Sequence, residues 1–251
     1  MYKRQVLSSG NEVVLTLNPD ANASETSWNI GNSGTQNVAC SGGGYANNST
    51  ITVSCCLPNG CYDLQVFDSM GDGINPGGFV LRDANNNRIL DNAGNGNTFT
   101  SLSEAATSFC LPIGIDAMAA ASCDNETLLA SSIITATANP AVTAQYNVTN
   151  STSGYQFWIF NPNGGYSRRM LITHATNNYL FPAGADRCSY LKLNSLTSNQ
   201  IPHNMLVNVR VRSLVNGVYS EFGSACRLKI NLTNQCPTTQ LLNNPMRKEV
   251  S

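Results

Sequence analysis

The stretch from residue 56 to residue 74 constrains the fold more than any other part of the chain. A turn sequence, Pro58-Asn59-Gly60, is followed by residues 62–67, in which apolar and polar side chains alternate as in a half-buried strand. The strand leads into residues 68–73, a turn rich in aspartate and glycine. An acidic loop that follows a strand, with no bidentate glutamate at its twelfth position, excludes an EF-hand. The stretch therefore favours a β-sheet protein.

The composition agrees with strands joined by tight turns. Most of the polar character comes from Asn, Ser, Thr and Gly, and charged residues make up only 12% of the chain. Because this balance disfavours long helices, we expect an all-β fold. The formal net charge is -1 and there is no basic run, so we expect no nucleic-acid partner. No apolar stretch approaches the roughly 20 residues of a membrane-spanning helix, so we expect no membrane insertion.

The spacing of the predicted strands divides the chain into two tandem antiparallel β-sandwiches. Short strands separated by Gly- and Asn-rich turns indicate a sandwich or jelly roll over residues 6–112. Residues 113–122 are a linker, since their weak apolarity provides no core. Residues 123–232 contain about seven strands, residues 145–148 among them, as expected of an immunoglobulin-like or fibronectin-like sandwich. Asn216-Gly217, between two alternating runs, predicts a type I′ hairpin.

The two ends of the chain belong to neither sandwich. Residues 1–5 look like translated adapter sequence, so we expect them to be non-native and leave them out of the fold. Residues 233–251 look like the lead into a further module. We therefore interpret the chain as a fragment of a larger protein.

Nine cysteines indicate an oxidising, extracellular environment. They lack the Cys-x-x-Cys spacing of a zinc site, and His174 and His203 lie in polar, turn-like sequence away from most of them. Cys56 and Cys61 flank a short turn that can bring their Cα atoms within the roughly 4.4–6.8 Å of a disulfide. Sequence alone cannot fix the connectivity. The other pairings that we consider are Cys40 with Cys55, Cys110 with Cys123 and Cys188 with Cys226, which leaves Cys236 over.

Asp68 and Asp72 are candidate ligands for calcium. They bracket a turn, and Gly73 follows where a chain that wraps an ion needs a sharp bend. Carboxylate and backbone oxygens are the ligands that Ca²⁺ prefers. Asp and Gly are equally typical of any tight turn. Two interpretations therefore stay open, a calcium site and turn chemistry alone.

The same stretch contributes to a resemblance that covers nearly all of the first sandwich. The segments that carry it are residues 15–20, 24–28, 57–62, 68–74 and 109–110. They resemble a CUB-like β-sandwich module of proteins that Bacteroidota secrete through the type IX system. The resemblance implies a secreted or surface multidomain protein, often with a hydrolase domain nearby, in which the module binds or stabilises. It also implies that acidic residues gather at one end, so that Glu25 or Asp20 would complete a calcium site.

The second sandwich is similar to the fibronectin type III-like module that accompanies such modules. The similarity rests on Tyr155-Gln156-Phe157, on residues 209–212 and on residues 216–226. The first module departs from its relatives in one place. They often carry a cysteine-bearing segment after Gly-Asp-Gly-Ile, whereas residues 75–78 follow here, so the pairing found in relatives is not transferred.

Aromatic and basic residues provide further binding candidates. Trp28 and Trp158 lie in alternating runs, and we expect them in the cores. Arg168-Arg169 is either a solvated strand edge or a site for an acid on a partner. Loop aromatics can stack on a sugar or act as packing lids. The ligand-binding candidates in Gly- and Asn-rich loops are Tyr45, Tyr166 and Tyr179.

The chain offers no evident set of nucleophile, base and orienting group, so we expect no enzymatic activity. We expect a non-catalytic extracellular binding or adhesion fragment, whose first module is a candidate calcium site and whose candidate partner is a surface glycan or a protein. Two alternatives stay open. One is an accessory region of a secreted peptidase or glycosidase, and the other is a purely structural stalk.

Overall fold

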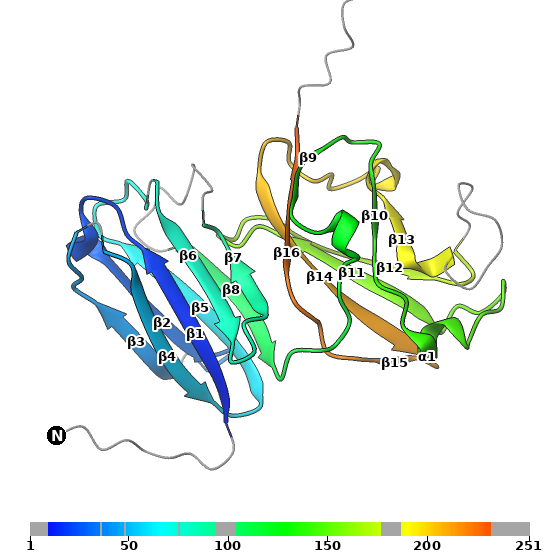
Figure 1. The fold of residues 1–251 in the computed structure, drawn as a ribbon, viewed down its shortest axis with the longest axis horizontal. Helices are drawn as coiled ribbons and strands as arrows, with labels where there is room; N and C mark the ends of the chain where they lie inside the picture. Colours follow the sequence, from blue (N-terminus) through cyan, green and yellow to red (C-terminus); the bar gives the residue numbers. More distant parts are fainter. Residues whose placement is uncertain are drawn as a thin grey trace, which may run out of the picture.

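The computed structural model describes residues 10–35, 37–47, 49–74, 76–93, 104–176 and 187–231. The fold is mostly β-structure in several antiparallel sheets, and its one α-helix in these ranges is the short α1 (Pro140–Thr143) (Figure 1). This confirms the expected β-rich class. We call residues 10–112 the N-terminal half and residues 113–231 the C-terminal half.

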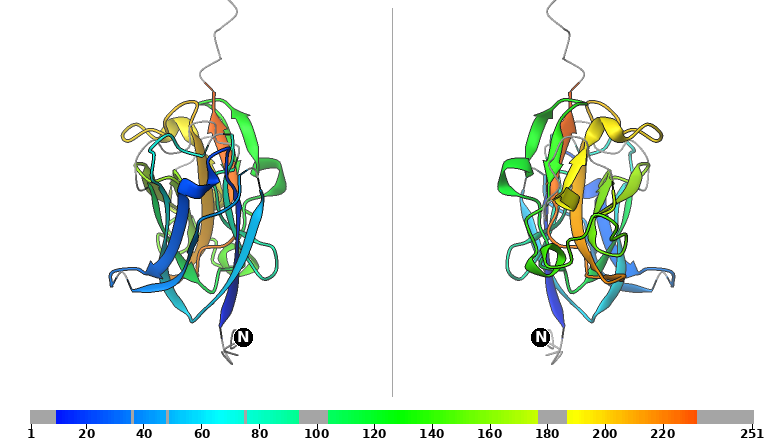
Figure 2. Two further views of the ribbon diagram at one scale, coloured as in Figure 1. Left: turned by 90° about the vertical axis from the view of Figure 1, so that its left-hand side faces the viewer. Right: turned by 90° about the vertical axis from the view of Figure 1, so that its right-hand side faces the viewer.

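The N-terminal half consists of two four-stranded antiparallel sheets. Their strand orders are β4-β1-β6-β7 and β3-β2-β5-β8. Seen from the side, the strands lie in two layers (Figure 2). The strands are β1 (Asn11–Asn18), β2 (Thr26–Asn32), β3 (Val38–Gly43), β4 (Ile51–Leu57), β5 (Gly60–Asp68), β6 (Gly78–Asp83), β7 (Arg88–Asp91) and β8 (Glu104–Leu111).

The alternation of residues explains why the two sheets pack together. In β5, the side chains of Tyr62, Leu64 and Val66 are buried, and those between them are half-exposed. β1 shows the same pattern in the facing sheet. Because successive side chains of a strand point to opposite faces, each sheet turns one apolar face inward, and the two faces form one hydrophobic core. The strand predicted after Gly60 is confirmed.

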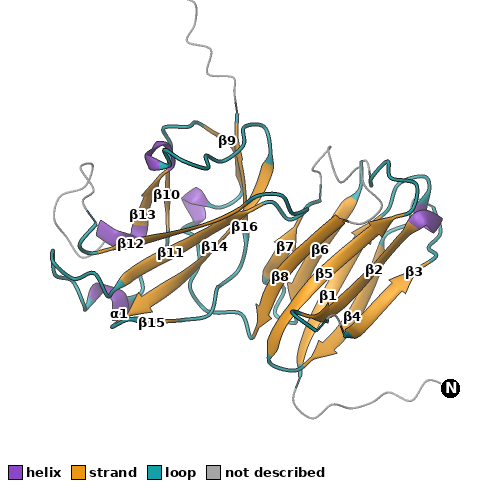
Figure 3. Ribbon diagram, turned by 180° about the vertical axis from the view of Figure 1, so that it is seen from behind, coloured by secondary structure: helices purple, strands orange, loops and turns teal. Residues whose placement is uncertain are grey.

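The C-terminal half contains one large sheet and one small sheet (Figure 3). The large sheet has the order β12-β11-β14-β16-β9, with β15 beside β14, and only its β9–β16 pairing is parallel among the described strands. The small sheet pairs β10 with β13. The strands are β9 (Asn125–Leu128), β10 (Ile133–Thr135), β11 (Gly154–Phe160), β12 (Ser167–Thr173), β13 (Tyr190–Lys192), β14 (Leu206–Val215), β15 (Val218–Tyr219) and β16 (Cys226–Ile230).

Local turn chemistry confirms one prediction in this half and overturns another. Asn216 and Gly217 adopt positive φ values of 50° and 81° between β14 and β15, as the predicted hairpin requires. The strand predicted at residues 145–148 is wrong, because this segment forms turns. The Asn147 side chain accepts a hydrogen bond from the Thr149 N–H at 3.0 Å, and such bonds compete with strand pairing.

Three disulfides are formed among the described residues, and they indicate an oxidising, extracytoplasmic environment. They join Cys40 to Cys55, Cys61 to Cys110 and Cys123 to Cys226. The first confirms an expected pairing. The expected pairings that prove wrong are Cys56 with Cys61, Cys110 with Cys123, and Cys188 with Cys226. Cys236 lies outside the described residues.

Strand direction and register explain the corrected pairings. Cys56 follows the buried Cys55 on β4, so its own side chain faces solvent. Cys61 on β5 lies directly opposite Cys110 on the neighbouring strand β8. Cys226 begins β16, which runs beside the strand that follows Cys123. Cys188 is buried. None of the described helices is long and apolar enough to cross a membrane.

The two halves pack against each other. Trp158, Phe160 and Phe222 of the C-terminal half join the hydrophobic core of the N-terminal half. Asn208 on β14 is fully buried at this contact. Its Oδ1 accepts a hydrogen bond from the Asp91 N–H, and its Nδ2 donates one to the Asp91 carbonyl, both at 2.7 Å. These contacts fix the face that the C-terminal sheet turns toward the N-terminal half.

The segment predicted as a linker is held on the C-terminal half. The buried Asp116 carboxylate accepts hydrogen bonds from the Ser213 N–H at 2.9 Å, the Ser220 hydroxyl at 2.7 Å and the Asn139 side-chain amide at 2.9 Å. Met118 is buried in the core of this half. The boundaries of the two modules stay a prediction.

Candidate functional site

Three carboxylates meet at one end of the N-terminal half. Asp68 is the last residue of β5, and Glu25 ends a short 3-10 turn (Ala23–Glu25) just before β2. Thr26 pairs with Asp68, and the Ser69 N–H donates to the Glu25 carbonyl at 3.2 Å. This antiparallel pairing places Glu25 beside the turn that carries Asp72. Carboxylate oxygens of Glu25, Asp68 and Asp72 all lie within 4.8 Å of one another.

Asp68 organises the turn on which Asp72 lies. Its side chain is fully buried. Its Oδ1 accepts a hydrogen bond from the Met70 N–H at 3.0 Å, and its Oδ2 accepts one from the Gly73 N–H. Gly71 and Gly73 adopt φ values of 79° and 81°, a region that favours glycine. Turn chemistry therefore accounts for Asp68 and for the predicted bend at Gly73.

Turn chemistry does not account for Glu25. Its Oε1 atom is buried and has no hydrogen-bond partner among the described residues. Burial raises the pKa of Glu25 above its ordinary value of 4.5, and the negative charges of Asp72, Asp68 and Asp20 raise this pKa further. Both effects oppose the ionised carboxylate, and a cation among the three carboxylates would counter both.

Asp20 lies near this cluster without joining it. Its Oδ1 accepts a hydrogen bond from the Asn22 N–H at 2.8 Å, while its charge acts on Glu25 from a distance. The sequence left Glu25 and Asp20 as alternatives, and the structure brings Glu25 together with Asp68 and Asp72. A second group of possible ligands, Asp124 with Cys123 and Cys226, is no metal site because the two cysteines form a disulfide.

The dimensions of the cluster suit calcium. Ca²⁺ takes oxygen ligands at roughly 2.3–2.6 Å, so two oxygens on one ion lie at most about 5 Å apart. The 4.8 Å spread of the three carboxylates fits this limit. The three carboxylates have six oxygens in total. Both oxygens of Asp68 already accept hydrogen bonds from the main chain. Backbone carbonyls or water would complete the six to eight ligands that the ion needs.

Two of the three tyrosines that were candidates for ligand binding make contacts within the described cores. The Tyr45 hydroxyl accepts a hydrogen bond from Trp28 Nε1 at 2.7 Å, and its ring packs on the core of the N-terminal half. The Tyr166 hydroxyl donates to the Asn199 carbonyl at 3.2 Å, and its ring is buried in the core of the C-terminal half. Tyr179 lies outside the described residues. Trp28 and Trp158 are buried, as expected.

One cysteine lies near a histidine in the C-terminal half. The Cys188 Sγ is 3.9 Å from His174 Nε2, and this nitrogen is 2.9 Å from the Val142 carbonyl. His174 lies in polar, turn-like sequence, yet packing on α1 buries it fully. Cys188 is also fully buried, so a substrate has no access to the pair.

Comparisons with known proteins find no family model that matches the chain and no curated protein that matches it. The resemblance to CUB-like and fibronectin-like modules therefore rests on the sequence motifs alone.

Proposed function

We propose that this chain is a non-catalytic extracellular binding protein whose N-terminal half holds a calcium ion through Glu25, Asp68 and Asp72. The observation that carries the proposal is the meeting of three carboxylates within 4.8 Å. No arginine or lysine forms an ion pair with any of them in the described part of the chain. The Glu25 Oε1 is buried and has no hydrogen-bond partner in the described ranges, which favours a bound ion over a plain turn.

The binding role is supported by the form of the protein. Its core is built from disulfide-linked antiparallel sheets, with strands ending in polar loops. The buried Cys188–His174 pair has no access to a substrate. We propose that the two halves are a CUB-like and a fibronectin type III-like module of a protein exported by the type IX system. Their place would be the outer cell surface or the medium.

Thermal unfolding with calcium and with excess chelator tests the calcium site. A ligand that binds only the folded state stabilises it by about 2.7 kcal/mol at a hundredfold excess over its dissociation constant. For a chain of this size, we expect the unfolding midpoint to rise by about 5–10 °C. Asp72→Asn should abolish the rise, whereas Glu12→Gln, an exposed charge change on β1, should keep it. Equal midpoints of the unaltered protein in calcium and in chelator would refute the proposal.

Glu25→Gln separates a calcium site from a structural role of Glu25. In chelator, this variant should be more stable than the parent protein, because it removes a carboxylate that burial and three neighbouring charges disfavour. In calcium, the order should reverse, since the variant loses a ligand. A variant that is less stable under both conditions would indicate that Glu25 acts in the fold alone.

A further inference from the structure

A row of arginines surrounds Trp158 on one face of the C-terminal sheet. Trp158 on β11 lies opposite Arg169 on β12 and opposite Arg210 on β14. Residues that pair directly across neighbouring strands point to the same face. Gln156 lies two residues before Trp158 on β11 and pairs with Arg212 on β14. The Arg212 guanidinium therefore belongs to the same face. The opposite face of the sheet forms the core of the C-terminal half.

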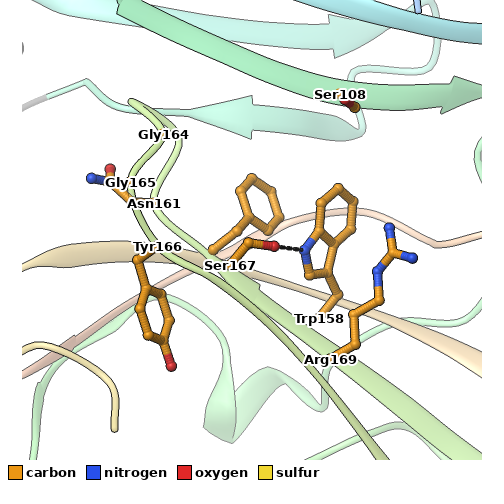
Figure 4. Close-up of a pocket in the computed structure, with 9 residues that line it drawn as sticks. Ser108, Trp158, Asn161, Gly164, Gly165, Tyr166, Ser167 and Arg169 are labelled. Atoms are coloured by element: carbon orange, nitrogen blue, oxygen red, sulfur yellow. Dashed lines mark hydrogen bonds between the residues drawn. The ribbon is translucent and has the colours of Figure 1, made fainter. Parts of the chain in front are cut away.

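The arginine face borders a cleft between the two halves. Trp158 and Arg169 project toward Ser108 on β8, and Tyr166 points the other way (Figure 4). Two cavities of about 510 and 180 Å³ lie here, and they share Ser108, Trp158 and Arg169 as lining residues. We call them the outer and the inner chamber of the cleft. The outer chamber alone falls within the roughly 300–1,000 Å³ of typical ligand sites.

The inner chamber carries an excess of positive charge. Arg169, Arg210 and Arg212 line it together with one acid, the exposed Glu221. No ion pair joins any of the three arginines to a carboxylate of the described residues. Arg169 contacts the rings of Trp158 and Phe222 there. Two guanidiniums with unused donors and one nearly buried guanidinium therefore face the same space.

The positive charge of Arg210 is energetically unfavourable because its side chain is buried. Its side chain is only 1% exposed. Its Nε and Nη2 donate to the carbonyls of Gly223 and Phe222, at 2.7 and 2.8 Å. Burial lowers its pKa to about 10, and Glu221 offsets a part of this shift, so the group stays charged at neutral pH. A buried charge without a counter-ion is unfavourable, and an anion in the inner chamber would neutralise it.

The aromatic rings of the cleft leave no open face for a neutral sugar. The Arg169 guanidinium lies 4.9 Å from the Trp158 ring centroid. The rings of Phe160 and Phe222 lie 4.4 and 5.2 Å from the same ring, and Trp158 is only 7% exposed. A pyranose ring needs an accessible aromatic face to stack on. Recognition in this cleft therefore depends on charge.

The outer chamber supplies neutral polar groups. Asn161 and Ser167 contribute an amide and a hydroxyl, and Gly164 and Gly165 leave backbone exposed beside them. Such groups can form hydrogen bonds with the hydroxyls of a sugar. The two chambers together match a molecule that is anionic at one end and rich in hydroxyls at the other.

We propose that this cleft binds a carboxylate-bearing saccharide, with the carboxylate held by Arg169 and Arg212 beside Arg210 and the sugar hydroxyls in the outer chamber. Guanidinium and carboxylate pair through two parallel hydrogen bonds, which gives both strength and orientation. The inference names a ligand class for the proposed binding role and rests on that role. It does not depend on the calcium site, which lies at the end of the N-terminal half.

Titration calorimetry of the full chain in chelator tests the cleft. The probes are digalacturonate, the neutral disaccharide galactobiose and a short oligoglutamate peptide. We expect digalacturonate to bind and galactobiose not to bind, with an affinity that falls as salt rises. Arg169→Gln and Arg212→Gln should each weaken binding about tenfold or more, since each removes a charge-assisted hydrogen bond.

Arg168→Gln is the matched control. It removes the same charge from the same strand, but Arg168 contacts the Ser198 and Asn199 carbonyls on the opposite face. This variant should bind digalacturonate as the parent chain does. The proposal is overturned if digalacturonate does not bind, if galactobiose or the peptide binds as tightly, or if Arg168→Gln weakens binding as much as Arg169→Gln. Because chelator is present throughout, such a failure leaves the calcium result untouched.

Discussion

Replacing Asn208 with alanine should loosen the contact between the two halves. Asn208 is fully buried and satisfies both main-chain groups of Asp91 through hydrogen bonds of 2.7 Å. The substitution leaves a buried N–H and a buried carbonyl without partners, and each costs about 1–3 kcal/mol. The two losses add up to about 2–6 kcal/mol of unfolding free energy. A loss of this size is far above that of an ordinary surface change.

Urea unfolding followed by fluorescence measures this loss. Trp158 lies in the shared core and reports on the contact directly. Asn194→Ala is the matched control, because Asn194 is exposed on the same half, and its unfolding free energy should change by no more than about 0.5 kcal/mol. If Asn208→Ala costs as little as the control, Asn208 does not hold the two halves together, and the geometry of the cleft is wrong.

Two further predictions concern the disulfides and pH. Replacing Cys123 and Cys226 with serine should cost about 4.7 kcal/mol, and replacing Cys40 and Cys55 about 3.0 kcal/mol, because the closed loops span 103 and 15 residues. Denaturant unfolding without reductant checks the order, and a larger loss at the shorter loop would contradict it. The calcium-induced rise in the unfolding midpoint should shrink as pH falls from about 7 to about 5. Because the pKa of Glu25 is raised, protons compete with the ion for this carboxylate as pH falls. In chelator, the raised pKa has the opposite effect, since the contribution of Glu25 makes the protein more stable as pH falls toward 4.5. A calcium-induced rise in the midpoint that does not depend on pH would argue against Glu25 as a ligand.

Local signals in the sequence predicted those features that depend on nearby residues. The alternation after Gly60 predicted β5, and Asn216-Gly217 predicted the hairpin between β14 and β15. Asp68 and Asp72 were found as a pair because one turn carries both. Glu25 could be named only as one of two alternatives, since its place depends on the pairing of β2 with β5.

Features that depend on strand order were beyond the sequence. Cys61 pairs with Cys110, 49 residues away, because β5 and β8 are neighbours in a sheet, and short spacing favoured Cys56 instead. The arginine face was not predicted, although the sequence contains a signal of it. Residues 209–212 alternate valine with arginine, which predicts a strand with one apolar and one basic face. That Arg169 and Trp158 share this face follows only from the register of β11 with β12 and β14.

If the chain were pulled from its two ends, the Cys123–Cys226 disulfide would transmit the force and bypass most of the C-terminal half. A force that acts on the chain before residue 123 and after residue 226 passes directly through the bond. The 103 residues of sequence separation correspond to about 350 Å of extended chain that cannot be drawn out. Strands β9 to β15 lie within this closed loop, so the covalent path of the force bypasses them. In a protein that holds a cell to a surface, this half would act as a link of fixed length.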